Sequence, residues 1–214
     1  MTNRQRFQLR VPDSQSVARN MSTRASGSNS SFRSQRYTNA GGYYQGRWLH
    51  GQHHGYGIKA TGRGLIYEGQ WLGGQRHGYG TLRRLGPNGH AQRIYVGQWS
   101  ADVRCGEGKQ DYENGDVYYG QWLGNVRHGR GIQWQPDGSI YVGEWLKDAM
   151  HGRGALCSAN GNRYVGEFAN GCKSGRGIYY HQQEEGQSVP QHGLWSDNMC
   201  RASLLPIKSA KRNL

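Results

Sequence analysis

The chain has 214 residues, of which 34% are hydrophobic and 35 are glycine, so a thick core between two layers of secondary structure is not expected. No apolar run approaches the roughly 18 residues that a membrane-spanning helix needs, and no short apolar core of a signal peptide is visible. The formal net charge of +13 would favour a nucleic acid or an anionic membrane as partner if the charge lay on a folded surface.

Residues 1–41 form the first predicted unit, a basic segment rich in Ser and Arg. It contains seven Arg and one Asp but few apolar residues, so it cannot bury enough surface to offset the entropy of ordering. We therefore predict a disordered tail. The same composition also fits a mitochondrial transit peptide, but no amphipathic helical period is clear, so the solvated tail is favoured.

Residues 42–200 form the second predicted unit, which is an internal repeat. The motif Tyr-x-Gly-x-Trp is followed, seven residues after its last aromatic residue, by Gly-x-Gly. The period is 23 residues, with insertions of five and four residues that both fall between Gly-x-Gly and the next aromatic motif. A degenerate seventh copy, QHGLW, begins at Gln191, after six clear copies that begin at Tyr44, Tyr67, Tyr95, Tyr118, Tyr141 and Tyr164.

Each repeat is predicted to be a β-hairpin, because two stretches of strand-like alternation are separated by turn residues. Consecutive hairpins would pair edge to edge into one elongated, twisted sheet in which each unit contacts only its neighbours. The predicted fold class is therefore all-β, a single-layer antiparallel sheet of tandem hairpins. The turns are expected near Gly51, Gly74, Asp102, Asn125, Asp148 and Gly171, and near Gly62, Asn114-Gly115, Asp137-Gly138 and Asn160-Gly161.

Aromatic residues and glycines recur on the same strand faces, so we predict that the large rings cover bare glycine backbone. The polar segment before the first copy and the degenerate seventh copy suit caps that protect the sheet edges. The predicted structural ladder consists of Tyr44, Trp48, Tyr67, Trp71, Tyr95, Trp99, Tyr118, Trp122, Tyr141, Trp145, Tyr164 and Phe168 with Gly55, Gly57, Gly78, Gly80, Gly106, Gly108, Gly129, Gly131, Gly152, Gly154, Gly175 and Gly177.

This pattern of Tyr-x-Gly-x-Trp followed by His-Gly-x-Gly resembles the MORN (membrane occupation and recognition nexus) repeat family over about residues 42–200. The resemblance implies a single-layer array of β-hairpins that acts as a scaffold or in membrane-associated assembly. It also implies a setting in cilia, flagella and male germ cells, with a role in spermatogenesis and an association with the cytoskeleton, the flagellum or the acrosome.

No catalytic, cofactor or metal site is predicted. Histidines precede Gly-x-Gly at four equivalent positions, His54, His77, His128 and His151. Equivalent positions in adjacent hairpins lie two strands, or about 9.6 Å, apart, whereas two nitrogens on one zinc ion lie at most about 4.2 Å apart. The repeated carboxylates and the Gly-x-Gly strings follow the period and precede no helix, which favours structural roles over acid–base chemistry or phosphate binding.

The four cysteines, Cys105, Cys157, Cys172 and Cys200, form no Cys-x-x-Cys pair and are too sparse for a secreted disulfide scaffold. We expect reduced thiols and a cytoplasmic location.

The face opposite the ladder is the candidate partner face. Tyr56 and Tyr79 make its N-terminal end aromatic, and Arg130, Arg153 and Arg176 form a basic row at its C-terminal end. Two glutamates of the aromatic motif, Glu144 and Glu167, are predicted to be cross-strand neighbours of that row. A salt-bridged, solvated surface is therefore favoured over a phosphoinositide site.

Residues 201–214 form the last predicted unit, a basic tail with two Arg, two Lys and no acidic residue. A long one-layer sheet leaves surface that favours a protein partner or a homodimer. The alternative is a peripheral membrane protein that binds anionic phospholipids weakly through its basic tails or through the arginine row. Nucleic acid is disfavoured as a partner, because the repeats are nearly neutral and contain no recognised reading element.

Overall fold

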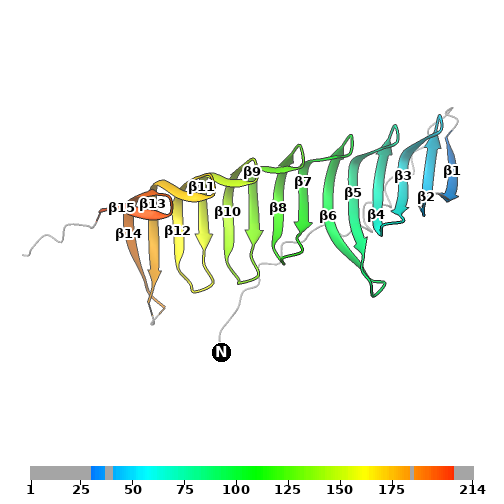
Figure 1. Ribbon diagram of the computed structural model, residues 1–214. Helices are drawn as coiled ribbons and strands as arrows, with labels where there is room; N and C mark the ends of the chain where they lie inside the picture. Colours follow the sequence, from blue (N-terminus) through cyan, green and yellow to red (C-terminus); the bar gives the residue numbers. More distant parts are fainter. Residues whose placement is uncertain (1–29, 37–40, 184–185, 205–214) are drawn as a thin grey trace, which may run out of the picture.

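A computed structural model describes residues 30–36, 41–183 and 186–204 of the chain. These residues form one sheet of 15 strands in which each strand pairs antiparallel with its neighbours in the sequence (Figure 1). No helix occurs in this part of the chain, so no helix there is long and apolar enough to cross a membrane. The predicted all-β, single-layer antiparallel sheet is confirmed.

The strands follow the repeat. Even-numbered strands from β2 to β12 carry the aromatic motif, and odd-numbered strands from β3 to β13 carry Gly-x-Gly. The degenerate seventh copy forms a complete hairpin of β14 and β15, and β15 has no Gly-x-Gly. The bounds are β1 Ser31–Arg36, β2 Gly42–Leu49, β3 Gln52–Thr61, β4 Leu65–Leu72, β5 Gln75–Leu85, β6 Ala91–Ser100, β7 Val103–Asp111, β8 Val117–Leu123, β9 Val126–Trp134, β10 Ile140–Leu146, β11 Ala149–Cys157, β12 Arg163–Ala169, β13 Cys172–Gln182, β14 Ser188–Ser196 and β15 Met199–Leu204.

The turns within repeats are two-residue loops in which both residues have positive φ. Lys147 and Asp148 have φ of 49° and 68°, and the glycine pair in the second repeat, Gly73 and Gly74, has 56° and 80°. Such loops have the twist of a type I′ turn, which matches the right-handed twist of the flanking strands. The predicted turn positions are confirmed.

The turns between repeats lie along the other edge of the sheet. In the turn after β7, the Gly115 N–H donates to the Tyr112 carbonyl at 3.0 Å, and the Asn114 side chain accepts the Asp116 N–H at 3.0 Å. The two insertions lie at this edge, and the one between β5 and β6 makes the loop that projects furthest in Figure 1.

Both ends of the array differ from the predicted boundaries. Residues 31–36 were assigned to the disordered tail, but they form β1 and pair with β2 in the register Ser31↔Trp48 to Arg36↔Tyr43. This polar strand is stable there because it covers the edge that β2 would otherwise leave open. Strand β15 likewise takes residues 201–204 from the predicted basic tail. The remainder of both predicted tails, including the transit-peptide alternative, lies outside the described residues.

The core lies on one face of the sheet and consists of aromatic rings. Each Tyr ring packs edge-on against the Trp or Phe of its own repeat, with centroids 5.0–5.2 Å apart. It packs against the aromatic ring of the next repeat at 5.0–5.5 Å. The buried rings are Tyr44, Tyr67, Trp71, Tyr95, Trp99, Tyr118, Trp122, Tyr141, Trp145, Tyr164, Phe168 and Trp195, with Trp48 partly buried beside them.

Each Tyr ring lies over glycine backbone, as predicted, but the two glycines are the one in its own motif and the second of Gly-x-Gly, not both glycines of Gly-x-Gly. A Cβ atom on Gly108 would lie 2.2 Å from the Tyr95 hydroxyl oxygen, and one on Gly97 would lie 2.6 Å from it. The same hydroxyl donates to the Gln98 carbonyl at 3.1 Å, so the ring has a polar anchor as well as a flat surface. No other residue type leaves room for the ring, which explains the two fixed glycines.

Candidate partner-binding face

The first glycine of each Gly-x-Gly has a different role from the second, which the sequence analysis did not foresee. Gly129 lies in a β-bulge with φ of 62°, and a Cβ there would lie 1.9 Å from the Gln121 Oε1. The Gln121 amide oxygen accepts the Arg130 N–H at 2.8 Å. The first glycine therefore makes space for a side chain that satisfies the bulge, and only the second supports a ring.

The predicted arginine row is present, and its side chains are exposed. Arg130 pairs across the strands with Glu144, and Arg153 pairs with Glu167, as predicted. However, the ion pairs found in the described residues involve none of Arg130, Arg153 and Arg176. The expectation of a salt-bridged row is wrong.

The glutamates beside the row interact with the bulges. Glu144 lies over Gly152 and accepts the Arg153 backbone N–H at 3.4 Å, and Glu167 lies over Gly175 in the same way. These carboxylates repeat the role of Gln121 in the preceding repeat. The guanidinium groups of the arginine row form none of the ion pairs found in the described residues.

The N-terminal end of the face is aromatic, as predicted. Two charged residues beside the aromatic residues, Glu68 and Arg83, are paired with each other. Tyr56 is 50% exposed, and its hydroxyl donates to Glu68, which also forms an ion pair with Arg83 at 2.8 Å. Burial and the hydrogen bond to Glu68 raise the pKa of Tyr56 above its usual range. Tyr79 is also exposed.

The C-terminal half of the face carries a second row beside the arginines, which the sequence analysis missed. It is made by one residue from each of six consecutive strands, β8 to β13, paired in register. These residues alternate with ladder residues along their strands, so they lie on the opposite face. We call this the apolar row: Tyr119, Ile132, Val142, Ala155, Val165 and Ile178.

The equivalent positions in the N-terminal half are mixed, with Glu68, Thr81 and Lys109 among them. The signal for the apolar row was present in the sequence, at the residue after each motif Tyr and the residue after each Gly-x-Gly. It was overlooked because those positions are not fixed in every repeat.

A groove separates the arginine row from the apolar row. It has a volume of about 550 Å³, and its lining includes Arg130, Arg153, Tyr119, Ile132 and Val142. Residues of five consecutive strands, from Glu107 on β7 to Arg153 on β11, contribute to it. The groove therefore runs across the strands between an arginine wall, which also includes Glu107 and Glu144, and an apolar wall.

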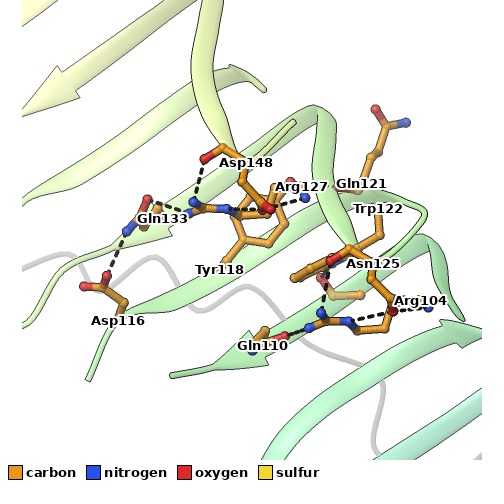
Figure 2. A network of polar contacts seen from close by, with 11 residues as sticks. Arg104, Gln110, Asp116, Tyr118, Gln121, Trp122, Asn125, Arg127, Gln133 and Asp148 are labelled. Atoms are coloured by element: carbon orange, nitrogen blue, oxygen red, sulfur yellow. Dashed lines mark hydrogen bonds and ion pairs between the residues drawn. The ribbon is translucent and has the colours of Figure 1, made fainter. Parts of the chain in front are cut away.

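The ladder face is covered by the chain itself. Arg127 on β9 lies with its guanidinium carbon 4.2 Å from the centroid of the Trp145 ring in the next repeat. Its Nε donates to Asp148 at 3.1 Å (Figure 2). Its Nη1 donates to Gln133 at 3.1 Å, so the side chain lies across the ring. Arg104 lies in the same way over Trp122, and Arg76 over Trp99.

This contact, which we call the repeat clamp, also involves the backbone. The Asp148 N–H donates to the Arg127 carbonyl at 3.1 Å, and the Asp148 carboxylate accepts the Arg127 N–H at 2.9 Å. Sequence reasoning missed the clamp, because the two partners belong to different repeats. The paired residues are His53 with Gly74, Arg76 with Asp102, Arg104 with Asn125, Arg127 with Asp148, Met150 with Gly171 and Lys173 with Asn198.

The repeated histidines and the cysteines form no centre. In the described residues, no group of three or more His, Cys, Asp or Glu side chains is placed to hold a metal ion. His128 and His151 lie on the rim of a second hollow together with Glu144 and Arg130. All four cysteines are free thiols, and Cys157 is the exposed one.

The comparison with known families agrees with this geometry. The family model described as MORN repeat matches residues 44–61, 67–84, 95–117, 118–140, 141–163 and 164–182, which is more than half of the chain. The chain belongs to the MORN repeat family. The six matches begin at the six predicted Tyr positions, so β1 and the MORN-like hairpin β14–β15 lie outside them. No curated protein matches the chain.

Proposed function

We propose that this MORN protein is a non-catalytic scaffold that binds a partner protein on the face opposite its aromatic ladder. The observation that supports the proposal is the arginine row, which is exposed and forms no ion pair within the described residues, beside an apolar row in which Val142 and Val165 are exposed. The ladder face is already covered by the repeat clamp. MORN repeats are consistent with a repeat scaffold or with binding of proteins or membranes.

The setting proposed for this scaffold is the assembly of sperm flagella or cilia. We propose a similarity to MORN repeat-containing protein 3 within the family, which rests on three strings of this sequence, YGTLRRLGPNGHAQRIYVGQW, NGNRYVGEF and GLWSDNMC. That similarity carries the proposal of a cytoplasmic protein associated with the cytoskeleton, the flagellum or the acrosome in male germ cells. Immunolocalisation in sperm checks it, and staining confined to other structures would contradict it.

The second candidate function is peripheral membrane binding, which the unpaired arginines of the row favour. Flotation of the full chain with anionic vesicles at physiological salt separates the two functions. A scaffold is expected to stay with the soluble fraction. Flotation that is lost in the variant Arg130→Gln/Arg153→Gln/Arg176→Gln, with circular dichroism unchanged, would replace the scaffold by a membrane binder.

The oligomeric state of the scaffold is a separate question, because a homodimer is one way to cover exposed sheet surface. Sedimentation equilibrium of the full chain at several concentrations measures it. The proposed partner face predicts that the Arg130→Gln/Arg153→Gln/Arg176→Gln variant leaves the measured mass unchanged.

A further inference from the structure

We propose that the groove between the arginine row and the apolar row holds an acidic amphipathic helix of a partner protein, lying across the strands. The inference rests on the proposed scaffold function and specifies the chemistry of the partner. It concerns β7 to β13, the C-terminal half of the face.

The apolar wall of the groove is wide enough for the apolar side of a helix. Val142 and Val165 in the apolar row are 48% and 40% exposed. Two residues further along the strands, at about 6.6 Å, lies another set of apolar side chains, Val117, Trp134 and Ile140, which pair with one another across β8, β9 and β10. A helix of about 10–12 Å diameter covers both sets.

The arginine wall selects the sign of the partner's charge. Arg130, Arg153 and Arg176 are exposed and belong to none of the ion pairs in the described residues. Glu144 and Glu167 lie over bulge glycines, and Glu107 lies at the β7 end of the groove, where a cationic partner residue would fit better than an acidic one. Carboxylates of a partner would form the missing ion pairs at the edge of an apolar contact. Such complementarity favours an acidic segment and disfavours a basic one.

The spacing of the row fits a helix. Successive arginines lie two strands apart, or about 9.6 Å, and seven residues of an α-helix advance about 10.5 Å. Acidic residues at i, i+7 and i+14 therefore face the three arginines, with a mismatch that long arginine side chains accommodate. The residues at i+3, i+6, i+10 and i+13 lie together on one side of that acidic stripe and face the apolar row.

The chain's own remaining segments do not fit the groove. Residues 1–29 contain five Arg and one Asp, and residues 205–214 contain two Lys and one Arg with no acidic residue. Both segments would be repelled by the arginine row. A second copy whose groove met this groove would bring arginine row against arginine row, which disfavours that dimer, so we propose a different, acidic protein as the occupant.

The test uses the full chain and a synthetic 21-residue helical peptide with Glu at heptad spacing beside a Leu stripe. Its control is the same peptide with Lys in place of Glu. Fluorescence anisotropy should show binding of the Glu peptide and at least tenfold weaker binding of the Lys peptide. Equal binding of both peptides, or of neither, would overturn the proposal.

Variants of the chain locate the site. Arg130→Gln/Arg153→Gln/Arg176→Gln should weaken binding of the Glu peptide about tenfold or more, and Val142→Asn should weaken it several-fold. Arg63→Gln, in an exposed turn between repeats, is the matched control and should leave binding unchanged. Because all of these side chains are exposed, their replacement leaves the ladder intact, which circular dichroism verifies. Unchanged binding in the triple variant would overturn the site.

Failure of this inference is distinguishable from failure of the scaffold function. If the Glu peptide does not bind and the full chain does not bind vesicles of phosphatidylcholine with phosphatidylserine, the proposal of a helical partner is wrong but the proposed scaffold function is not contradicted. If the vesicles bind through the arginine row while the peptide does not, both the proposed helical partner and the proposed scaffold function are wrong, and the ligand of the row is a lipid surface.

Discussion

At the scale of single residues, the fold depends on large rings that become buried although the sheet has only one layer. Tyr95 and Tyr118 are fully buried, because two glycines lie beneath each ring and Trp rings pack on either side. Burial raises the pKa of both hydroxyls above the usual range, so they stay neutral and donate to backbone carbonyls. The sheet therefore builds its core from one face.

Replacing Trp122 by Ala tests this core. The indole packs against Tyr95 and Tyr118 and donates to the Gly108 carbonyl at 3.1 Å. We expect Trp122→Ala to lower the free energy of unfolding by about 3–5 kcal/mol, measured by urea denaturation. Leu123→Ala is the control, because Leu123 is 60% exposed and its replacement should change stability by less than about 0.5 kcal/mol.

His53 makes the first repeat sensitive to acid. It is 7% exposed and stacks on Tyr44 with centroids 3.7 Å apart, and burial, assisted by the charge of Lys59, lowers the pKa of its imidazole from 6.5 to about 4. The unfolded chain therefore binds the proton first as pH falls. The contribution of neutral His53 to stability is complete above pH 6.5 and is lost between pH 6.5 and 4.

The variant His53→Phe keeps a stacked ring and removes the titration. Between pH 7 and 4.5 the unmodified protein should lose roughly 2–3 kcal/mol more of its free energy of unfolding than the variant. Urea denaturation of both at the two pH values measures the difference. Equal losses would show that His53 does not titrate between the folded and unfolded states.

At the scale of the element, neighbouring hairpins are joined by the repeat clamp as well as by backbone pairing. The clamp is also electrostatic, as Asp102 shows. Burial opposes the negative charge of the Asp102 carboxylate, but hydrogen bonds from Arg76 outweigh that effect and lower the pKa of the carboxyl. The clamp also covers the Trp ring of the next repeat with a guanidinium, which removes an apolar surface from solvent.

A double-mutant cycle measures the clamp. The variants Arg127→Ala, Asp148→Ala and their combination should give an interaction energy of about 1 kcal/mol in the free energy of unfolding, because Arg127 is largely buried while Asp148 is half exposed. The same cycle at the exposed pair of Arg84 and Glu113 should give a value near zero. Similar values for the two pairs would contradict the clamp.

The sequence predicted the hairpins because fixed aromatic residues, glycines and turn residues recur with one period. It did not predict the bulge at Gly129, because alternation of residue types does not show an extra residue in one strand. The bulge in turn determines the direction of the Glu144 side chain. The cross-strand pairing of Arg130 with Glu144 was therefore predicted correctly, but an ion pair between them was predicted wrongly. The clamp of Arg127 and Asp148 was missed because its partners are one repeat apart.

At the scale of the whole molecule, the face opposite the ladder has two different halves. In the N-terminal half, Glu68, Arg83, Arg93 and Asp111 form ion pairs among themselves. In the C-terminal half, the apolar row replaces them. One repeated backbone can therefore carry two different surfaces on this face, because the positions that build the ladder alternate along every strand with the positions on the opposite face.

The clamp also limits how such a chain can lengthen by gene duplication. The third repeat contains both an acceptor, Asp102, and a cation, Arg104, and the fourth contains Asn125 and Arg127. If either repeat were duplicated in tandem, the cation of the original repeat could therefore pair with the acceptor of the copy. A copy of the fifth repeat would instead set its Asp148 beside Met150. Growth by duplication is therefore expected to succeed from the middle of the array outward, and the atypical pairs at its ends act as stops.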